Sequence, residues 1–161
     1  MLDPSTILFI HGSGGDKSQT YKACILRGIF PGMITPDFSG DVTQRMAQLE
    51  DILGRKKGWN LIGSSLGGLM AALYTTKHPS RVRKLILLAP ALVLPEFADH
   101  LPDPIDVPTM IIHGTRDEIV PLKSVRDLAQ KVFTNFHYLI VEDDHRLHIT
   151  AEAVDWRALL A

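Results

Sequence analysis

The chain has 161 residues, of which 45% are hydrophobic and 22% are charged, and its formal net charge is -1. This composition is typical of one soluble globular domain, and the near-neutral charge gives no electrostatic reason to expect nucleic acid as a partner. The single cysteine, Cys24, excludes an internal disulfide scaffold, and no apolar run approaches a membrane span, so we expect one cytoplasmic domain over residues 1–161 with no membrane partner.

Short apolar runs rich in β-branched residues alternate with longer segments of helical period along the chain. This alternation predicts repeated βα units, and hence a three-layer α/β/α sandwich around a mainly parallel sheet. Because most runs are almost entirely apolar, we expect helices on both faces of the sheet. Six strands are predicted, at Ile7 to Ile10, Met33 to Asp37, Trp59 to Gly63, Lys84 to Ala89, Thr109 to His113 and His137 to Val141.

The second of these runs contains Pro36, which has no N–H to donate to a neighbouring strand. We therefore expect that strand at an edge of the sheet. Between the strands, apolar residues recur three and four positions apart, as on one face of a helix. The clearest examples are Val42, Met46, Leu49 and Leu53 in one segment, and Val125, Leu128, Ala129 and Val132 in another.

A glycine-flanked serine follows the third predicted strand. The sequence Gly63-Ser64-Ser65-Leu66-Gly67 lies where this strand ends and a helical stretch from Leu66 to His78 begins. Only Ser65 has glycine two residues away on both sides, which is the G-x-S-x-G pattern of a strained turn that exposes a nucleophile above a helix N-terminus. The pattern also occurs by chance in strand-to-helix turns, so Ser65 needs support from elsewhere in the chain.

A second glycine-rich loop, His11-Gly12-Ser13-Gly14-Gly15, follows the first predicted strand. Its backbone N–H groups, with Ser13 as our choice, are expected to converge with the N–H of Leu66 on a developing oxyanion. An alternative interpretation is a phosphate-binding loop ending in Lys17 and Ser18. That motif requires glycine at positions 11 and 16, where the chain has His11 and Asp16.

Acidic and basic candidates follow the last two predicted strands. Asp117 lies in His113-Gly114-Thr115-Arg116-Asp117, and His145 lies four residues past the sixth strand. Loops at the carboxyl ends of parallel strands share one edge of the sheet, so we expect Ser65, Asp117 and His145 to meet there. Glu118 is the alternative to Asp117, and His148 is the alternative to His145. A metal site is a further alternative, with Asp143, Asp144, His145 and His148 as ligands. We do not favour it, because the sequence shows no clear further cluster of ligands.

The order Ser, Asp, His and the sequence around each resemble the α/β-hydrolase superfamily, as does the stretch from Lys77 to Val82 that leads into Leu85 to Pro90. The resemblance implies a minimal α/β-hydrolase fold without the first two strands of the family, similar to its compact, lidless, esterase-like members. It gives His11 a structural part in the oxyanion loop. One departure is that Asp144, rather than glycine, precedes His145.

The resemblance implies a serine hydrolase with Ser65 as nucleophile, His145 as general base and Asp117 as the acid that orients it. We expect cleavage of carboxylic esters of small or medium acyl groups through an acyl-enzyme, without cofactor or metal. The alternatives are thioesterase or amidase chemistry, or a non-catalytic protein-binding module. The segment from Ala91 to Val107 is expected at the lid position. It contains apolar and acidic residues but no lysine or arginine. It therefore either favours an apolar acyl group and disfavours anionic substrates, or is only a solvated loop with apolar anchors.

Overall fold

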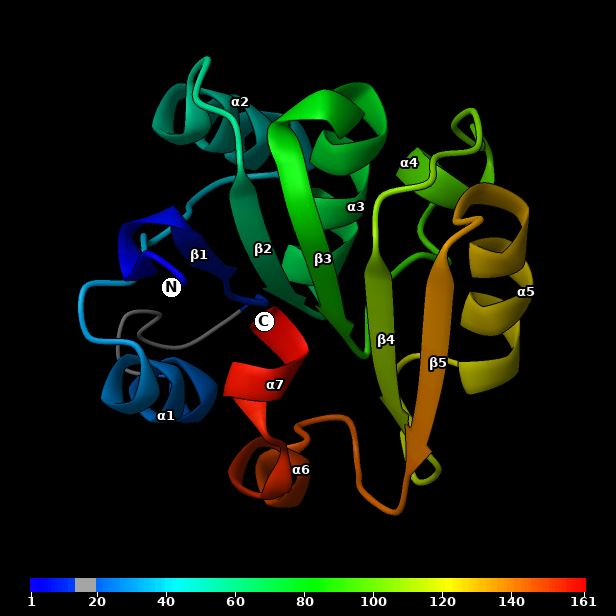
Figure 1. Cartoon of the computed structure of the whole chain (residues 1–161). Coiled ribbons are helices and arrows are strands. Elements are labelled where there is room, and N and C mark those ends of the chain that lie inside the picture. Colours follow the sequence, from blue (N-terminus) through cyan, green and yellow to red (C-terminus); the bar gives the residue numbers. More distant parts are fainter. Residues whose placement is uncertain (14–19) are drawn as a thin grey trace.

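The computed structural model describes residues 1–13 and 20–161. Within these residues five parallel strands form one sheet in the order β1-β2-β3-β4-β5 (Figure 1). The carboxyl ends of the strands therefore share one edge of the sheet. The strands are β1 (Ile7–Ile10), β2 (Trp59–Ser64), β3 (Val82–Leu88), β4 (Thr109–Gly114) and β5 (Phe136–Val141).

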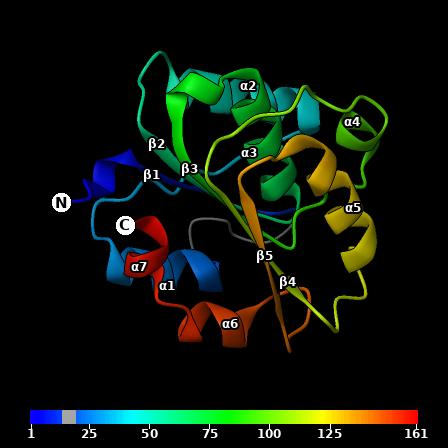
Figure 2. The ribbon, with the colours of Figure 1, turned by 45° about the vertical axis from the view of Figure 1, so that its right-hand side comes forward.

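Helices cover both faces of the sheet, which gives the predicted three layers (Figures 1 and 2). One face carries α1 (Tyr21–Ile29), α6 (His148–Ala153) and α7 (Trp156–Leu160). The other carries α2 (Val42–Leu53), α3 (Leu66–Lys77), α4 (Pro95–Ala98) and α5 (Leu122–Val132). Two short 3-10 helices are η1 (Pro4–Thr6) and η2 (Pro79–Arg81).

Side chains of β1 alternate between the two layers, as a strand's period of two requires. Ile7 and Phe9 pack with the α1, α6 and α7 side, whereas Leu8 and Ile10 pack with α2 and α3. The predicted helical period in residues 42–53 is confirmed by α2, in which Leu49 and Leu53 are buried against this second layer. The apolar runs thus form a core on each side of the sheet.

The prediction of six strands is wrong, because Met33 to Asp37 does not form one. Ile34 makes a single parallel bridge to Leu8: its N–H donates to the Ile7 carbonyl (2.9 Å) and its carbonyl accepts from the Phe9 N–H (2.9 Å). The next hydrogen bond of such a ladder would come from the N–H of residue 36, and Pro36 has none. The segment does lie at the outer side of β1, which is the edge position predicted from Pro36.

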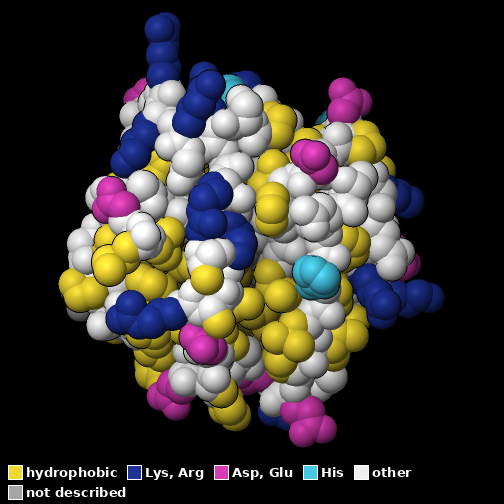
Figure 3. Space-filling view, in the orientation of Figure 1, with side chains coloured by type: hydrophobic (Ala, Val, Ile, Leu, Met, Phe, Trp, Pro, Cys, Tyr) yellow, Lys and Arg dark blue, Asp and Glu magenta, His cyan; other side chains and the backbone are white. Residues whose placement is uncertain are grey.

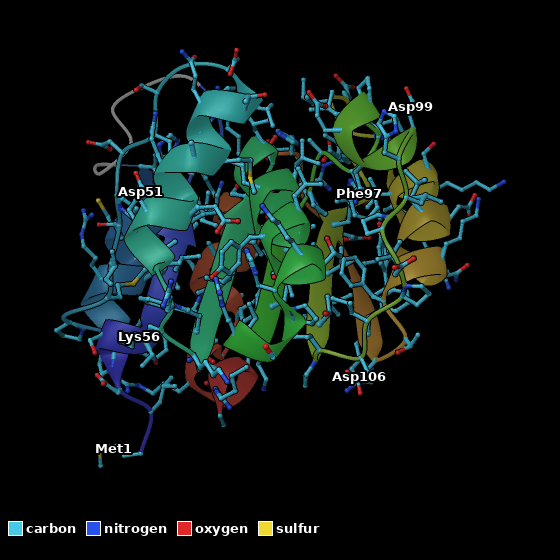
Figure 4. All side chains as sticks on the ribbon, turned by 90° about the horizontal axis from the view of Figure 1, so that it is seen from above. Met1, Asp51, Lys56, Phe97, Asp99 and Asp106 are labelled. Atoms are coloured by element: carbon cyan, nitrogen blue, oxygen red, sulfur yellow. The ribbon has the colours of Figure 1, made fainter. Side chains whose placement is uncertain are left out.

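Of the two expectations for residues 91–107, the lid is wrong and the loop with apolar anchors is confirmed. This segment belongs to the crossover from β3 to β4. It begins at the carboxyl edge, where the Ala91 N–H donates to the Ser65 carbonyl (3.0 Å), and then runs along the layer of α3 and α5 (Figure 2). Phe97 is fully buried and stacks on Phe133 with ring centroids 6.4 Å apart, while Asp99 is exposed (Figure 4). Ile105 bridges to Phe133, just before the amino end of β5. The apolar residues of the segment thus anchor a connection.

The edge strand β5 is less covered than expected. Leu139 and Ile140 are 42% and 43% exposed, on opposite faces of the strand. Hydrophobic side chains gather beside α6 and α7 on the face seen in Figure 3. A hollow of about 510 Å³ next to these two helices is lined by Leu139, Val141 and Ile149. Among the described helices none is long and apolar enough to cross a membrane.

Candidate active site

Ser65 occupies a sharp turn between β2 and α3, with φ 55° and ψ -113°. A side chain rarely adopts this positive φ, so surrounding packing must hold it in place. The flanking glycines make the close packing possible. A Cβ on Gly63 would overlap the Gly67 carbonyl oxygen, and a Cβ on Gly67 would overlap the Ile10 carbonyl oxygen. The glycine spacing seen in the sequence thus corresponds to two places where backbones touch.

The structure brings the three predicted side chains together at the carboxyl edge of the sheet. His145 Nε2 lies 3.0 Å from Ser65 Oγ, and His145 Nδ1 lies 2.8 Å from Asp117 Oδ2. The alternative histidine, His148, instead packs its ring on Tyr21 with centroids 4.2 Å apart. The geometry therefore favours His145 over His148 as the partner of Ser65.

Asp117 is held as a buried carboxylate. Its Oδ1 accepts from the backbone N–H groups of Ile119 (2.9 Å) and Val120 (2.8 Å), and its side chain is fully buried. Burial raises the pKa of this carboxyl, but the hydrogen bonds from Val120, His145 and Ile119 outweigh it and hold the pKa below its ordinary value. The alternative carboxylate, Glu118, is exposed.

His113 is a contact of Asp117 that the sequence did not reveal. Its side chain is fully buried, and Nε2 lies 3.0 Å from the Val120 carbonyl and 3.1 Å from Asp117 Oδ2. Burial lowers its pKa more than Val120 and Asp117 raise it, which favours a neutral ring. Two acceptors at Nε2 place the ring proton there. The Tyr138 hydroxyl lies 2.9 Å from Nδ1 and 3.0 Å from the Leu122 carbonyl oxygen, so its single proton has two acceptors. The only hint in the sequence is the spacing of four residues to Asp117.

The loop after β1 is held by hydrogen bonds with Phe38 and with the buried side chain of Arg45. The Phe38 N–H donates to His11 Nε2 (3.0 Å), so the His11 proton sits on Nδ1 and is donated to the Gly12 carbonyl. Arg45, only 3% exposed, donates to the carbonyls of His11 (3.0 Å) and Gly12 (3.4 Å). In a trans peptide the N–H points away from the carbonyl, so the Gly12–Ser13 unit directs the Ser13 N–H the other way.

The two N–H groups predicted to bind an oxyanion are those of Ser13 and Leu66. In the described parts of the chain neither donates a hydrogen bond. Leu66 opens α3, whose N-terminal N–H groups and dipole favour a negative charge. Positions 14 and 15 of the predicted loop, and the phosphate-loop alternative at Lys17 and Ser18, lie outside the described residues.

A cavity of about 660 Å³ opens at Ser65. Residues 91–107 contribute nothing to its described lining, so their lack of lysine and arginine does not set its charge. Two cations, Lys22 and Arg146, line it instead. The lining residues are Phe9, His11, Gly12, Ser13, Thr20, Tyr21, Lys22, Ser64, Ser65, Ile119, His145, Arg146 and His148.

The acidic pair before His145 has a structural use. Asp143 is buried, and its Oδ2 accepts from the Thr150 N–H (2.9 Å) and hydroxyl (2.8 Å), while Oδ1 accepts from the Asp144 N–H (2.8 Å). Its carbonyl accepts from the Arg116 N–H (3.0 Å), which joins the Asp117 and His145 loops. Among the described residues no three His, Cys, Asp or Glu side chains are grouped to hold a metal ion.

We expect Asp143→Asn to lower the free energy of unfolding at pH 7 by about 2 kcal/mol, because an amide offers one acceptor oxygen where the carboxylate offers two. Burial raises the pKa of Asp143, but hydrogen bonds from Thr150 and Asp144 hold it below 3.8. A lowered pKa stabilises the folded state above the unfolded pKa, and this contribution is lost as the pH falls through the folded pKa. Urea unfolding from pH 7 to pH 3 should show wild type and variant converging in acid. Glu142→Gln, at an exposed neighbour, should follow wild type; parallel curves for Asp143→Asn would contradict the assignment.

Comparison with known proteins identifies the fold family. A sequence model described as alpha/beta hydrolase fold matches residues 6–106, which is more than half of the chain. The search of curated proteins returns no match. Among solved structures, a hydrolase of the α/β superfamily from Xanthomonas campestris pv. campestris is 28% identical, with 96% of this chain and 95% of that chain covered and a TM-score of 0.75.

More distant structures share the fold. Est1E from Butyrivibrio proteoclasticus, solved with ferulic acid bound, is 18% identical over 95% of this chain and 87% of that chain, with a TM-score of 0.73. Alpha/beta hydrolase domain-containing protein 10 from mouse is 20% identical over 92% and 87%, with a TM-score of 0.71. With the family match over residues 6–106, these likenesses establish that the chain belongs to the α/β-hydrolase fold family.

Proposed function

We propose that the protein is a serine hydrolase that cleaves carboxylic esters of small or medium acyl groups through an acyl-enzyme. The observation that carries the proposal is the chain of hydrogen bonds from Ser65 Oγ to His145 Nε2 (3.0 Å) and from His145 Nδ1 to Asp117 Oδ2 (2.8 Å). A nucleophile, a base and a group that orients the base are the parts that acyl transfer needs. The cavity volume of about 660 Å³ is in the usual range for small-molecule sites.

In the first half of the reaction His145 Nε2 accepts the proton of Ser65 as Oγ bonds to the carbonyl carbon of the ester. The Asp117 carboxylate keeps the other imidazole proton on Nδ1 and stabilises the imidazolium that forms. The carbonyl oxygen becomes an oxyanion, and the N–H groups of Ser13 and Leu66 are proposed to bind it. The tetrahedral intermediate then expels the alcohol, which takes the proton from His145 Nε2.

In the second half a water molecule occupies the place of the alcohol. His145 removes its proton while the oxygen attacks the acyl carbon, and the same N–H groups bind the second oxyanion. Collapse of this intermediate breaks the bond to Ser65 Oγ and returns the proton to it. Because the base must be neutral to begin either half, we expect activity to fall in acid.

A fluorophosphonate probe tests the proposal directly, because it phosphonylates only an activated serine. We expect one label per chain, carried by Ser65, together with turnover of short-chain para-nitrophenyl esters. Ser65→Ala should lose both the label and the turnover, with its thermal unfolding unchanged. A folded wild-type protein that stays unlabelled, or equal turnover by Ser65→Ala, would refute the proposal.

A further inference from the structure

The cavity at Ser65 has a cationic wall. Lys22 of α1 and Arg146 both line it, whereas none of its described lining residues is Asp or Glu. The two cations come from segments far apart in the sequence and are joined by a hydrogen bond from Lys22 Nζ to the Arg146 carbonyl (2.7 Å). Their positions therefore depend on one another.

Both cations keep hydrogen-bond donors for a ligand. An ammonium has three N–H donors, and within the described residues Lys22 uses one of them. The Arg146 guanidinium makes no hydrogen bond or ion pair to the described part of the chain. The hydrogen bonds of this residue are formed by its backbone: the N–H donates to Asp144 Oδ1 (2.9 Å) and the carbonyl accepts from Lys22 Nζ (2.7 Å). A planar guanidinium beside an ammonium is a suitable pair of donors for a carboxylate or phosphate.

The nearby carboxylates do not line the cavity. Asp143 is buried and directs its oxygens to Thr150 and to the Asp144 N–H, and Asp144 Oδ1 accepts from the Arg146 N–H. The positive charge of this wall also affects the pKa of His148. Burial lowers its pKa first, and the charges of Lys22 and Arg146 lower it further, against the opposing effect of Asp144 and Asp143.

The wall adjoins the residue that would protonate the leaving group. In acyl transfer the leaving oxygen must come to the imidazole nitrogen that protonates it, which is His145 Nε2 in the proposed reaction. Arg146 follows His145 directly, and Lys22 is hydrogen-bonded to the Arg146 carbonyl. Ile119, 70% exposed, and Phe9 supply apolar lining elsewhere in the cavity.

We propose that the preferred substrates are esters whose alcohol part carries an anionic group, which Lys22 and Arg146 bind. This inference rests on the proposed function and names its substrate class. It also reverses the expectation, drawn from residues 91–107, that anionic substrates are disfavoured.

Two matched pairs of esters test the proposal. In the first pair the charge is on the alcohol part: para-(butyryloxy)benzoate against para-(butyryloxy)benzamide. In the second it is on the acyl part: the para-nitrophenyl monoester of succinate against para-nitrophenyl butyrate. The measured quantity is the ratio of kcat/KM for the anionic and the neutral member of each pair, corrected for their rates of hydroxide hydrolysis.

We expect wild type to prefer the anionic member of the first pair. Lys22→Met should lower that ratio about threefold, and the charge reversal Arg146→Glu about tenfold, as for partly exposed ion pairs. A general loss of activity from a displaced His145 loop cancels in the ratio. Lys131→Met, which removes an exposed lysine on α5, is the matched control and should leave the ratio unchanged.

A first-pair ratio that stays the same in Lys22→Met and Arg146→Glu overturns the inference, and so does a change confined to the second pair. In both cases ester turnover and labelling of Ser65 persist, so the proposed function survives. Absence of turnover of all four esters together with absence of labelling would instead remove the proposed function, and this inference with it.

Discussion

Asp117→Asn is expected to lower kcat by ~10³- to 10⁴-fold while leaving the fold intact, as for the equivalent change in serine-hydrolase triads. The surroundings fix how the new amide lies. Two N–H groups, those of Ile119 and Val120, donate to Oδ1, against one contact of His113 Nε2 with Oδ2 (3.1 Å). The amide oxygen therefore stays at Oδ1 and the NH₂ group takes the place of Oδ2, facing His145 Nδ1, while His113 keeps the Val120 carbonyl as its acceptor. An NH₂ donor requires a lone pair on Nδ1. The imidazole proton then moves to Nε2, which can no longer accept the proton of Ser65.

The measurement is kcat and KM with a neutral ester, because a tautomer effect acts on kcat and a lost binding contact would act on KM. Glu118→Gln is the matched control: it removes a neighbouring carboxylate that is exposed, and we expect less than a ~2-fold change. A kcat of Asp117→Asn within tenfold of the wild-type kcat would show that another group orients His145. A large loss of kcat in Glu118→Gln would then identify Glu118 as that group.

The parts of the site that could be predicted from sequence are those in which local backbone geometry demands particular residues. The turn at Ser65 requires glycine on both sides because backbones touch there, so its spacing is visible in the chain itself. Asp117 and His145 could be placed near it because parallel strands deliver their following loops to one edge. His145 and His148 are only three residues apart, and the choice between them depends on which ring faces Ser65 in the folded chain.

The parts that could not be predicted depend on contacts between distant segments. His113 and Tyr138 lie 25 residues apart and meet only because β4 pairs with β5 in register. Lys22 lies 124 residues from Arg146, and neither carries a local motif. Residues 91–107 occupy the position expected of a lid, between β3 and β4, but are held along the layer of α5 by the burial of Phe97. Composition alone does not say which side of a sheet a connection covers.

The strand predicted at Met33 to Asp37 failed for a reason that the sequence did contain. Pro36 was used to place the segment at an edge, where its missing N–H costs least. The same missing N–H also stops the ladder, because residue 36 would donate the hydrogen bond that follows the bridge at Ile34. A proline in so short a run therefore predicts the loss of the strand as well as its place.

Gly67→Ala is the second change with a large expected effect, this time on stability. A Cβ at Gly67 would overlap the Ile10 carbonyl oxygen and lie 2.6 Å from the His11 carbonyl oxygen. Both atoms are backbone, so relief requires α3 to move away from the end of β1. We expect a loss of about 3 kcal/mol in the free energy of unfolding and a fall in Tm of ~10 °C.

The same movement should separate Leu66, which opens α3, from the loop that carries His11 and Ser13. We therefore expect the folded fraction of Gly67→Ala to lose kcat, measured well below its Tm, because the two proposed oxyanion donors no longer converge. Gly28→Ala is the matched control. A Cβ there meets nothing within 4 Å, and the residue lies in α1, so alanine should raise stability by about 0.5–1 kcal/mol. If both glycine variants unfold at the wild-type temperature, the contact between α3 and β1 is not tight, and neither is the turn that presents Ser65.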